Sequence, residues 1–376
     1  MRALLRGQAA APAAASALNP FGDLAVPPFV AALPKADLHL HQEAVPRLDA
    51  VLARRARRPP HDWRAAARRV MAEVPPGMAR LEAIFAPDDA PPGTGPVGRA
   101  LDADPELFVA RLAHVLAEGA AAGAVLLEVR CGAVEVVSRP DFMALFRAAE
   151  RRARRHSPRL RAEAIAYLGV RDDAAAMAVE ARRFEACLRA ARDGLAGIDF
   201  RVDPYGTDDP APWALAATWA HRAADAGLGI TVHAGEFSAG NLEPALRLPG
   251  VRRIGHGVHA AATPHLLERV ARSGVTLECC LSSNVVLGAV ASYQTHPIRR
   301  LMAHGIPVTL NTDLPMHVCT TIDREYAIAA ALGFSPAELL TFTRTAVEAS
   351  FTTPQRRAAL LREVGGAPRG DNESPD

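Results

Sequence analysis

Two histidines, His39 and His41, alternate with leucine in the stretch ADLHLHQEA, so they share one side of an extended strand. One such pair is weak support for a metal site, because ordinary buried or surface histidines are commoner. Three other short stretches add side chains of the same kind: His233 in TVHAGE, His256 in RIGHG and Asp313 in TLNTD. Three of these four imidazoles, together with the one carboxylate, would form a ligand set that suits zinc and leaves room for a water.

Two carboxyl groups in these stretches could move protons at such a metal. Zinc lowers the pKa of a bound water to about 7 and so gives hydroxide at neutral pH. Asp313 could bind the metal and also take a proton from that water. Glu236 lies three residues beyond His233, in the loop after the predicted strand, where it could shuttle a proton without binding the metal.

These residues lie at the ends of short apolar runs, which we interpret as strands. Eight such runs occur, and most of the intervals between them are long enough for a helix. Alternating strands and helices predict a parallel sheet, and eight strands predict a closed barrel whose functional groups lie at the carboxyl ends of the strands. The predicted strands cover residues 36–41, 125–130, 162–167, 197–202, 229–233, 253–256, 275–280 and 307–313.

Two of the intervals carry more detail. Residues 104–119 predict a helix, because Asp104 can cap it, Pro105 suits its first turn, and apolar residues recur on one face. Residues 44–98 are too many for a simple crossover and include the loop PDDAPPGTGPVG. We therefore predict an α/β fold, a (β/α)₈ TIM barrel with a helical insertion after strand 1 that forms a flap over the barrel mouth.

Bulk properties exclude several classes of protein. The chain has 376 residues, 49% of them hydrophobic, and a net charge of only +2, which gives no reason to expect nucleic acid as a partner. We find no apolar run of membrane-spanning length. Five scattered cysteines without a CxxC spacing argue against a disulfide framework and favour a cytoplasmic protein. We expect a flexible N-terminal arm at 1–30, one barrel domain at 31–364 and a disordered tail at 365–376; the sequence does not indicate an oligomeric state.

The chain resembles the adenosine deaminase family of the amidohydrolase superfamily of metal-dependent hydrolases. The resemblance rests on PKADLHLH, LEVRC, TVHAGE, RIGHG, LECCLSSNVVLGAV, HPIRRLMAHGIPVTLNTD and TRTAVEASF, which follow one another between about residues 34 and 351. It implies the (β/α)₈ barrel and one Zn²⁺ per chain, although a site of three histidines and one aspartate accepts other divalent metals as well.

The resemblance also implies a role for each residue of the site. His39, His41, His233 and Asp313 would bind the zinc. Glu236 would protonate the ring nitrogen beside the carbon under attack, and His256 would orient the zinc-bound water and help to activate it. The reaction would be attack of zinc hydroxide on an amidine-like carbon, followed by loss of ammonia.

The departures from the family pattern cluster where the substrate is recognised. Leu314 follows Asp313, whereas the family usually has a second acid there that contacts the purine, and losing such a hydrogen bond costs roughly 1–3 kcal/mol. Glu43 and Ala44 replace an Asp-Gly pair, and Val202 stands where the family has glycine. We expect the substrate-binding residues to be Glu43, Val202, Gly235 and Leu314.

Three functions remain open on this basis. The first is a zinc-dependent deaminase of an amino-purine, its nucleoside or a related aminated heterocycle. The second is hydrolysis of another C–N bond, such as an amide or a cyclic amidine in specialised metabolism, which the departures favour. The third is a metal-binding protein without turnover.

Overall fold

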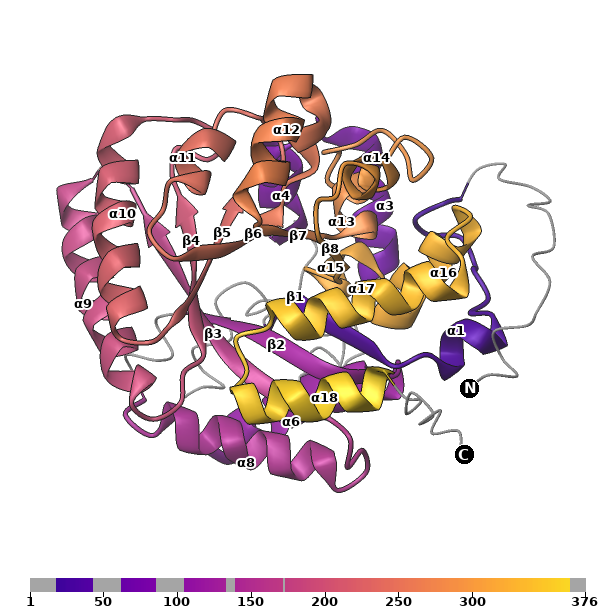
Figure 1. Cartoon of the computed structure of the whole chain (residues 1–376), viewed down its shortest axis with the longest axis horizontal. Helices are drawn as coiled ribbons and strands as arrows, with labels where there is room; N and C mark the ends of the chain where they lie inside the picture. The colour runs from indigo at the N-terminus through magenta and orange to yellow at the C-terminus, as the bar shows by residue number, and fades with distance from the viewer. Residues whose placement is uncertain (1–17, 43–61, 86–104, 133–138, 172, 366–376) are drawn as a thin grey trace, which may run out of the picture.

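The computed structural model of the chain describes residues 18–42, 62–85, 105–132, 139–171 and 173–365. The strands in these residues form one eight-stranded parallel sheet in chain order, β1 to β8. A further bridge joins Leu40 to Asp313 and brings the first strand against the segment after the last (Figure 1). The predicted (β/α)₈ TIM barrel is therefore confirmed.

All eight predicted strands are present, with small shifts at their ends. The strand predicted over 307–313 is observed only over Val308–Leu310, because Asn311 ends it. The Asn311 side chain accepts a bond from the Leu38 amide at 2.9 Å and donates one to the Cys279 carbonyl at 3.2 Å. The strands are β1 (Lys35–His41), β2 (Ala124–Gly132), β3 (Arg161–Val170), β4 (Gly197–Val202), β5 (Gly229–Ala234), β6 (Val251–His256), β7 (Thr276–Cys279) and β8 (Val308–Leu310).

Helices cover the outside of the barrel. The helix predicted over 104–119 is α6 (Pro105–Ala121), and its apolar face is buried at Phe108 and Leu112; Asp104 lies outside the described residues. The other helices beside the strands are α8 (Phe142–Arg154), α9 (Ala174–Ala191), α10 (Pro210–Asp225), α11 (Leu242–Leu246), α12 (Pro264–Ser273), α14 (Ile298–Ala303), α16 (Ile322–Ala331), α17 (Pro336–Ala349) and α18 (Pro354–Gly365). Among the described residues, no helix is both long enough and apolar enough to cross a membrane.

The two sides of each strand pack against different surroundings. In β4, Ile198, Phe200 and Val202 join the apolar core between the sheet and the helices. The alternate side chains of the strands fill the barrel interior, where five fully buried charged residues meet: Glu128, Arg130, Asp199, Arg253 and Glu278. Arg130 pairs with Asp199 and Glu278, and Arg253 pairs with Glu128 and Glu278.

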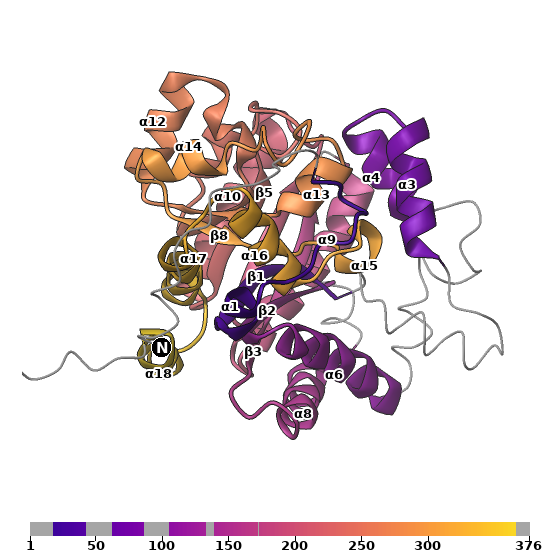
Figure 2. The ribbon, with the colours of Figure 1, turned by 90° about the vertical axis from the view of Figure 1, so that its right-hand side faces the viewer.

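Two helices of the insertion, α3 (Trp63–Glu73) and α4 (Met78–Phe85), form what we call the helical cap. Figure 2 shows them beside α13 (Leu281–Val286) and α15 (Pro315–Val318), both of which follow carboxyl ends of strands. Asp62 begins α3 by accepting a bond from the Ala65 amide at 2.9 Å. The two described helices of the insertion thus lie at the mouth of the barrel, and the loop PDDAPPGTGPVG falls outside the described residues.

Part of the segment expected to be a flexible arm packs on the barrel. Phe21 is buried in the apolar cluster of the helical cap, and α1 (Pro28–Ala32) follows it. Arg324 of α16 donates bonds to the carbonyls of Pro20 and Gly22, each at 3.0 Å. These contacts hold residues 18–32 against the body of the protein, while residues 1–17 and 366–376 lie outside the described part of the chain.

Candidate active site

Four buried side chains meet at the carboxyl end of the barrel. His39, His41, His233 and Asp313 each offer one ligand atom, and these atoms lie within 4.8 Å of one another. Among the described residues, the buried Nε2 of His39 makes no hydrogen bond, although it lies 3.3 Å from the Asp313 Oδ1. A buried nitrogen that faces other ligand atoms, in a set of three imidazoles and one carboxylate, fits a divalent metal such as zinc.

Two buried carboxylates orient the histidines of this cluster. Glu278 lies 2.9 Å from the Nδ1 of His39, and Asp199 lies 2.9 Å from the Nδ1 of His233. Burial alone would raise the pKa of each carboxyl, but Arg130 and the imidazoles hold the pKa of both well below the usual range. Each carboxylate therefore accepts the proton of Nδ1, which leaves the Nε2 lone pair facing the cluster.

The backbone brings Asp313 to the cluster in an unusual conformation. Its φ of +58° lies in the left-handed region, which costs a non-glycine residue roughly 1–2 kcal/mol. Two backbone bonds to β1 hold it there, from the Asp313 amide to the His39 carbonyl at 2.7 Å and from the His41 amide to the Asp313 carbonyl at 2.9 Å. Ser283 donates to the Asp313 Oδ2 at 2.6 Å, so the other oxygen is left for the cluster.

Glu236 stands beside the cluster with its own hydrogen-bond partner. The Tyr205 hydroxyl donates to the Glu236 Oε2 at 2.9 Å, and the His256 Nε2 lies 3.6 Å from the same oxygen. Burial, followed by the charge of Asp313, raises the pKa of Glu236 to about 8. Burial lowers the pKa of His256 well below its usual value, so this ring is neutral at pH 7.

A cavity of about 110 Å³ opens onto these groups. It is lined by His41, His233 and Asp313, by the proton-bearing groups Glu236 and His256, and by five further residues: Leu81, Tyr167, Arg201, Tyr205 and Leu314.

Sequence reasoning missed four of these lining residues: Leu81 of the helical cap, Tyr167, Arg201 and Tyr205. The Tyr167 ring lies edge-on to His41 and His233, with centroids 5.1 and 5.3 Å away. Tyr167 was the last residue of the predicted strand 162–167, so the rule that strand ends carry function could have found it. Arg201 lies two residues beyond Asp199 in β4, so it points to the same side of the strand near its carboxyl end, and the same rule could have found it. Tyr205 lies in the loop after β4 and carried no such signal.

The structure places the expected substrate-binding residues in different surroundings. Leu314 lines the cavity, whereas Val202 packs in the core outside the sheet, because strand alternation turns Arg201 inward instead. Gly235 does not line the cavity; its φ of +66° makes the sharp turn between His233 and Glu236, and a Cβ there would lie 2.7 Å from Leu242. Glu43 lies outside the described residues.

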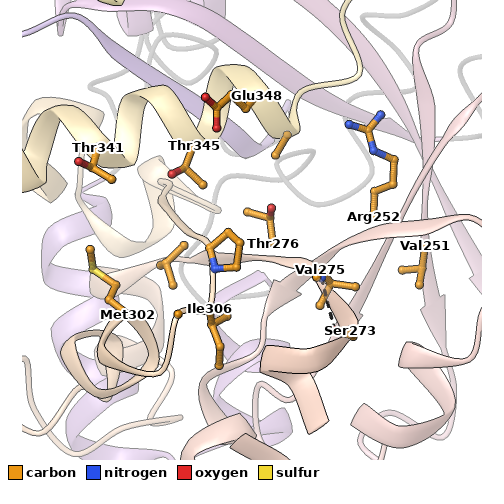
Figure 3. A pocket seen from close by; sticks show the side chains of 15 residues that line it. Val251, Arg252, Ser273, Val275, Thr276, Met302, Ile306, Thr341, Thr345 and Glu348 are labelled. Atoms are coloured by element: carbon orange, nitrogen blue, oxygen red, sulfur yellow. Dashed lines mark hydrogen bonds between the residues drawn. The ribbon is translucent and has the colours of Figure 1, made fainter. Parts of the chain in front are cut away.

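A larger hollow of about 560 Å³ lies at the opposite end of the barrel. Its lining includes Val251, Thr276 and Val308, which stand at the amino ends of β6, β7 and β8. Figure 3 shows Thr341, Thr345 and Glu348 of α17 along one side of this hollow. The ligand cluster and Glu236 are at the other end of the strands, so the smaller cavity is the candidate active site.

The family model for adenosine deaminase matches residues 107–367, well over half of the chain. The chain belongs to the adenosine deaminase family. An adenine deaminase of Mesorhizobium japonicum is 44% identical over 149 residues, 39% of this chain and 46% of that relative. An adenosine deaminase of Serratia proteamaculans is 38% identical over 181 residues, 48% of this chain and 53% of the relative. The chain thus aligns with about half the length of these curated relatives.

Matches to solved structures with the same fold cover more of this chain than the matches to the curated relatives do. The crystal structure of adenine deaminase from Arthrobacter aurescens has a TM-score of 0.69 and 26% identity, and the match covers 89% of this chain and 98% of that one. An Arabidopsis N6-mAMP deaminase has a TM-score of 0.68 at 20% identity, over 90% of this chain and 98% of that one, which is a likeness of fold.

Proposed function

We propose that this protein is a zinc-dependent hydrolytic deaminase that replaces an amino group on a purine or a related heterocycle with oxygen and releases ammonia. The observation that carries the proposal is the position of Glu236 beside the four-ligand cluster, inside one cavity. Relatives that are named adenine and adenosine deaminases support the purine. The partner of the site is thus a small heterocyclic molecule.

We assign the metal to His39, His41, His233 and Asp313. A zinc ion held by them would lower the pKa of a water to about 7 and so supply a nucleophile at neutral pH. Neighbouring imidazoles outweigh burial and hold the pKa of Asp313 well below the usual range, so its carboxylate is ionised, and we assign it as the acceptor for the proton of that water. His256, whose Nε2 lies 3.6 Å from the Glu236 Oε2, orients the attacking oxygen.

Glu236 supplies a proton to the ring nitrogen beside the carbon under attack. Its oxygen Oε2 is held by Tyr205, so the proton lies on Oε1, the oxygen left for the substrate. A protonated ring nitrogen makes the adjacent carbon more electrophilic, and a second proton transfer then converts the amino group into ammonia as leaving group. One water is consumed and one ammonia is released for each substrate.

The cavity supports a compact substrate with an apolar edge. Leu314 offers no hydrogen bond where the family usually has an acid, and Leu81 of the helical cap lines the same cavity. Arg201 brings a cation into the cavity, paired with Asp203 at 3.1 Å. Leu314 and Arg201 together favour the second candidate, hydrolysis of another C–N bond such as that of an amide or a cyclic amidine.

Ammonia release by purified, zinc-loaded protein tests the proposal. The panel contains adenine, adenosine, 2′-deoxyadenosine and other aminated heterocycles, with cyclic amidines and amides for the second candidate. Fast release from any aminated heterocycle supports the deaminase. Zinc-loaded protein that is inactive on all aminated heterocycles would contradict it, and turnover confined to an amide would establish the second candidate.

A further inference from the structure

Three side chains outside the ligand cluster form a line of hydrogen bonds that ends at His256. The amide of Ile298, at the start of α14, donates to the Nδ1 of His296 at 3.1 Å. The Nε2 of His296 lies 3.2 Å from the Oδ1 of Asn284, and the Nδ2 of Asn284 lies 3.2 Å from the Nδ1 of His256. His256, Asn284 and His296 are all buried, so each of these contacts is made without competing water.

The first donor in this line fixes the direction of every other bond. A backbone amide only donates, so the Nδ1 of His296 is an acceptor and its single proton lies on Nε2. Burial lowers the pKa of His296 to about 3, which agrees with a neutral ring. The Nε2–H of His296 then needs an acceptor, so the Asn284 oxygen faces it. The NH₂ group of Asn284 consequently faces His256.

The last bond of the line decides which nitrogen of His256 carries the proton. Because Nδ1 accepts from Asn284, the neutral His256 ring holds its proton on Nε2, the nitrogen that lies 3.6 Å from the Glu236 Oε2. His256 thus presents an N–H, and no lone pair, to the reacting groups. The left-handed backbone of His256, with a φ of +65°, aims the ring into the cavity.

We propose that His296 is a positioning residue of this site, which acts through Asn284 to hold His256 as an Nε2–H donor toward the attacking oxygen. His256 then orients the nucleophile by donating to it, and the proton of the water goes to Asp313. This inference rests on the proposed function for its kinetic consequence. Its structural content, the tautomer of His256, is independent of any substrate.

The tautomer is measured directly by long-range ¹H–¹⁵N correlation NMR on zinc-loaded full-length protein labelled at histidine. The chain has 13 histidines, and the His256 signals are assigned by their loss in His256→Asn. We expect a protonated Nε2 and an unprotonated Nδ1 in the wild-type protein. A protonated Nδ1 on His256 would overturn the proposal whether or not the protein is active.

Asn284→Asp reverses the direction of the hydrogen bond between residue 284 and the Nδ1 of His256, with almost no change in side-chain shape. The new carboxylate accepts from both rings, so His256 should move its proton to Nδ1 and lose its donor toward the cavity. We expect kcat to fall roughly 10²–10⁴-fold, the usual range for a displaced proton donor or acceptor. Asn311→Asp places the same charge at another buried asparagine, where the carboxylate can still accept from the Leu38 amide, and should leave the His256 tautomer unchanged.

Two variants at His296 separate positioning from simple packing. His296→Gln keeps an amide N–H that can donate to Asn284 and should retain kcat within about tenfold of wild type. His296→Leu fills the space but removes the donor, and should lower kcat more than KM and give a mixture of His256 tautomers. The same His256 tautomer and the same kcat in the Leu and Gln variants would overturn the proposal. These two variants also test it if Asn284→Asp does not fold.

Discussion

At the scale of single residues, proton positions distinguish the members of this site. Asp313 stays ionised among three imidazoles, whereas Glu236, in the same cavity, has a raised pKa because burial and the Asp313 charge both oppose its ionisation. Two carboxyl groups whose environments push their pKa values apart can act as a proton acceptor and a proton donor. The division of labour that we propose for Asp313 and Glu236 follows from this contrast.

Replacing Glu236 by glutamine should abolish turnover without removing the metal. Glutamine keeps the size and the bond to Tyr205 but cannot deliver a proton, so we expect kcat to fall by roughly 10²–10⁴-fold or more. Zinc content by mass spectrometry should equal that of the wild-type protein, which we expect to be one per chain. Loss of zinc in Glu236→Gln would show that Glu236 belongs to the ligand set.

Tyr205 should affect turnover through Glu236. Tyr205→Phe removes the donor to the Glu236 Oε2, a bond worth roughly 0.5–1.5 kcal/mol, so we expect kcat to fall about threefold to tenfold. Tyr326→Phe is the matched control, because its buried hydroxyl bonds to Thr343 at 2.8 Å, away from Glu236. Equal kcat values for the two variants would argue against a role for Tyr205.

At the scale of elements, the helical cap and the loop after β8 share an apolar cluster. Leu314 is 3% exposed and packs in one cluster with Ala67 and Val70 of α3 and Ile84 of α4. The residue that departs from the family pattern therefore does two things, lining the cavity and anchoring the cap. The sequence indicated only the first.

Leu314→Asp should cost stability even if it restores a purine contact. The change removes a buried leucine and adds a carboxylate to an apolar cluster, and we expect the free energy of unfolding to fall by about 3 kcal/mol or more. Urea denaturation measures this, with Leu314→Met as the control, expected to lose less than about 1.5 kcal/mol. A Leu314→Asp protein as stable as wild type would mean that water reaches this position.

At the scale of the whole molecule, a second buried carboxyl group sets a pH dependence of stability. Glu325 of α16 accepts bonds from the Ser282 amide at 3.2 Å and from the Thr320 hydroxyl at 2.5 Å. Burial raises its pKa from 4.5 to about 7, despite these bonds and the nearby Arg324. The folded protein therefore binds this proton more tightly than the unfolded chain, and stability falls as pH rises from about 4.5 to 7.

Glu325→Gln should remove this part of the pH dependence. A difference of 2.5 pKa values corresponds to about 3 kcal/mol, so the free energy of unfolding of the variant, relative to wild type, should rise by about that amount between pH 4.5 and pH 8. Denaturation at several pH values measures it, with the exposed Glu268→Gln as control. A constant difference across this range would contradict the buried, protonated state of Glu325.

Removal of the metal should lower the melting temperature of the whole barrel. The proposed ligands come from β1, β5 and the segment after β8, so zinc would tie distant parts of the chain together. Zinc at 100 times its dissociation constant should add about 2.7 kcal/mol to the free energy of unfolding. Calorimetry of chelated and zinc-loaded protein tests this, and Asp313→Ala should show a much smaller difference.

The sequence predicted the barrel and the central cluster because both depend on short-range patterns. Alternation placed His39 and His41 together, and the rule about strand ends gathered His233 and Asp313 with them. It did not predict the surroundings, since these depend on which strand neighbours which. The family resemblance points to Val202, whereas strand alternation turns Arg201 into the barrel. Tyr205 lies in a loop without periodicity, so no sequence pattern marks it.

The bridge between Leu40 and Asp313, which closes the barrel, also bears on how this protein is synthesised. A ribosome that has synthesised β1 to β7 has released three of the proposed ligands, but neither the fourth ligand nor the strand that closes the ring. Barrel closure joins residues more than 270 positions apart in the chain, as the bond from Leu38 to Asn311 shows. Such distant pairing makes folding slow. The complete ligand set therefore assembles late in synthesis, and a chain truncated before β8 lacks it.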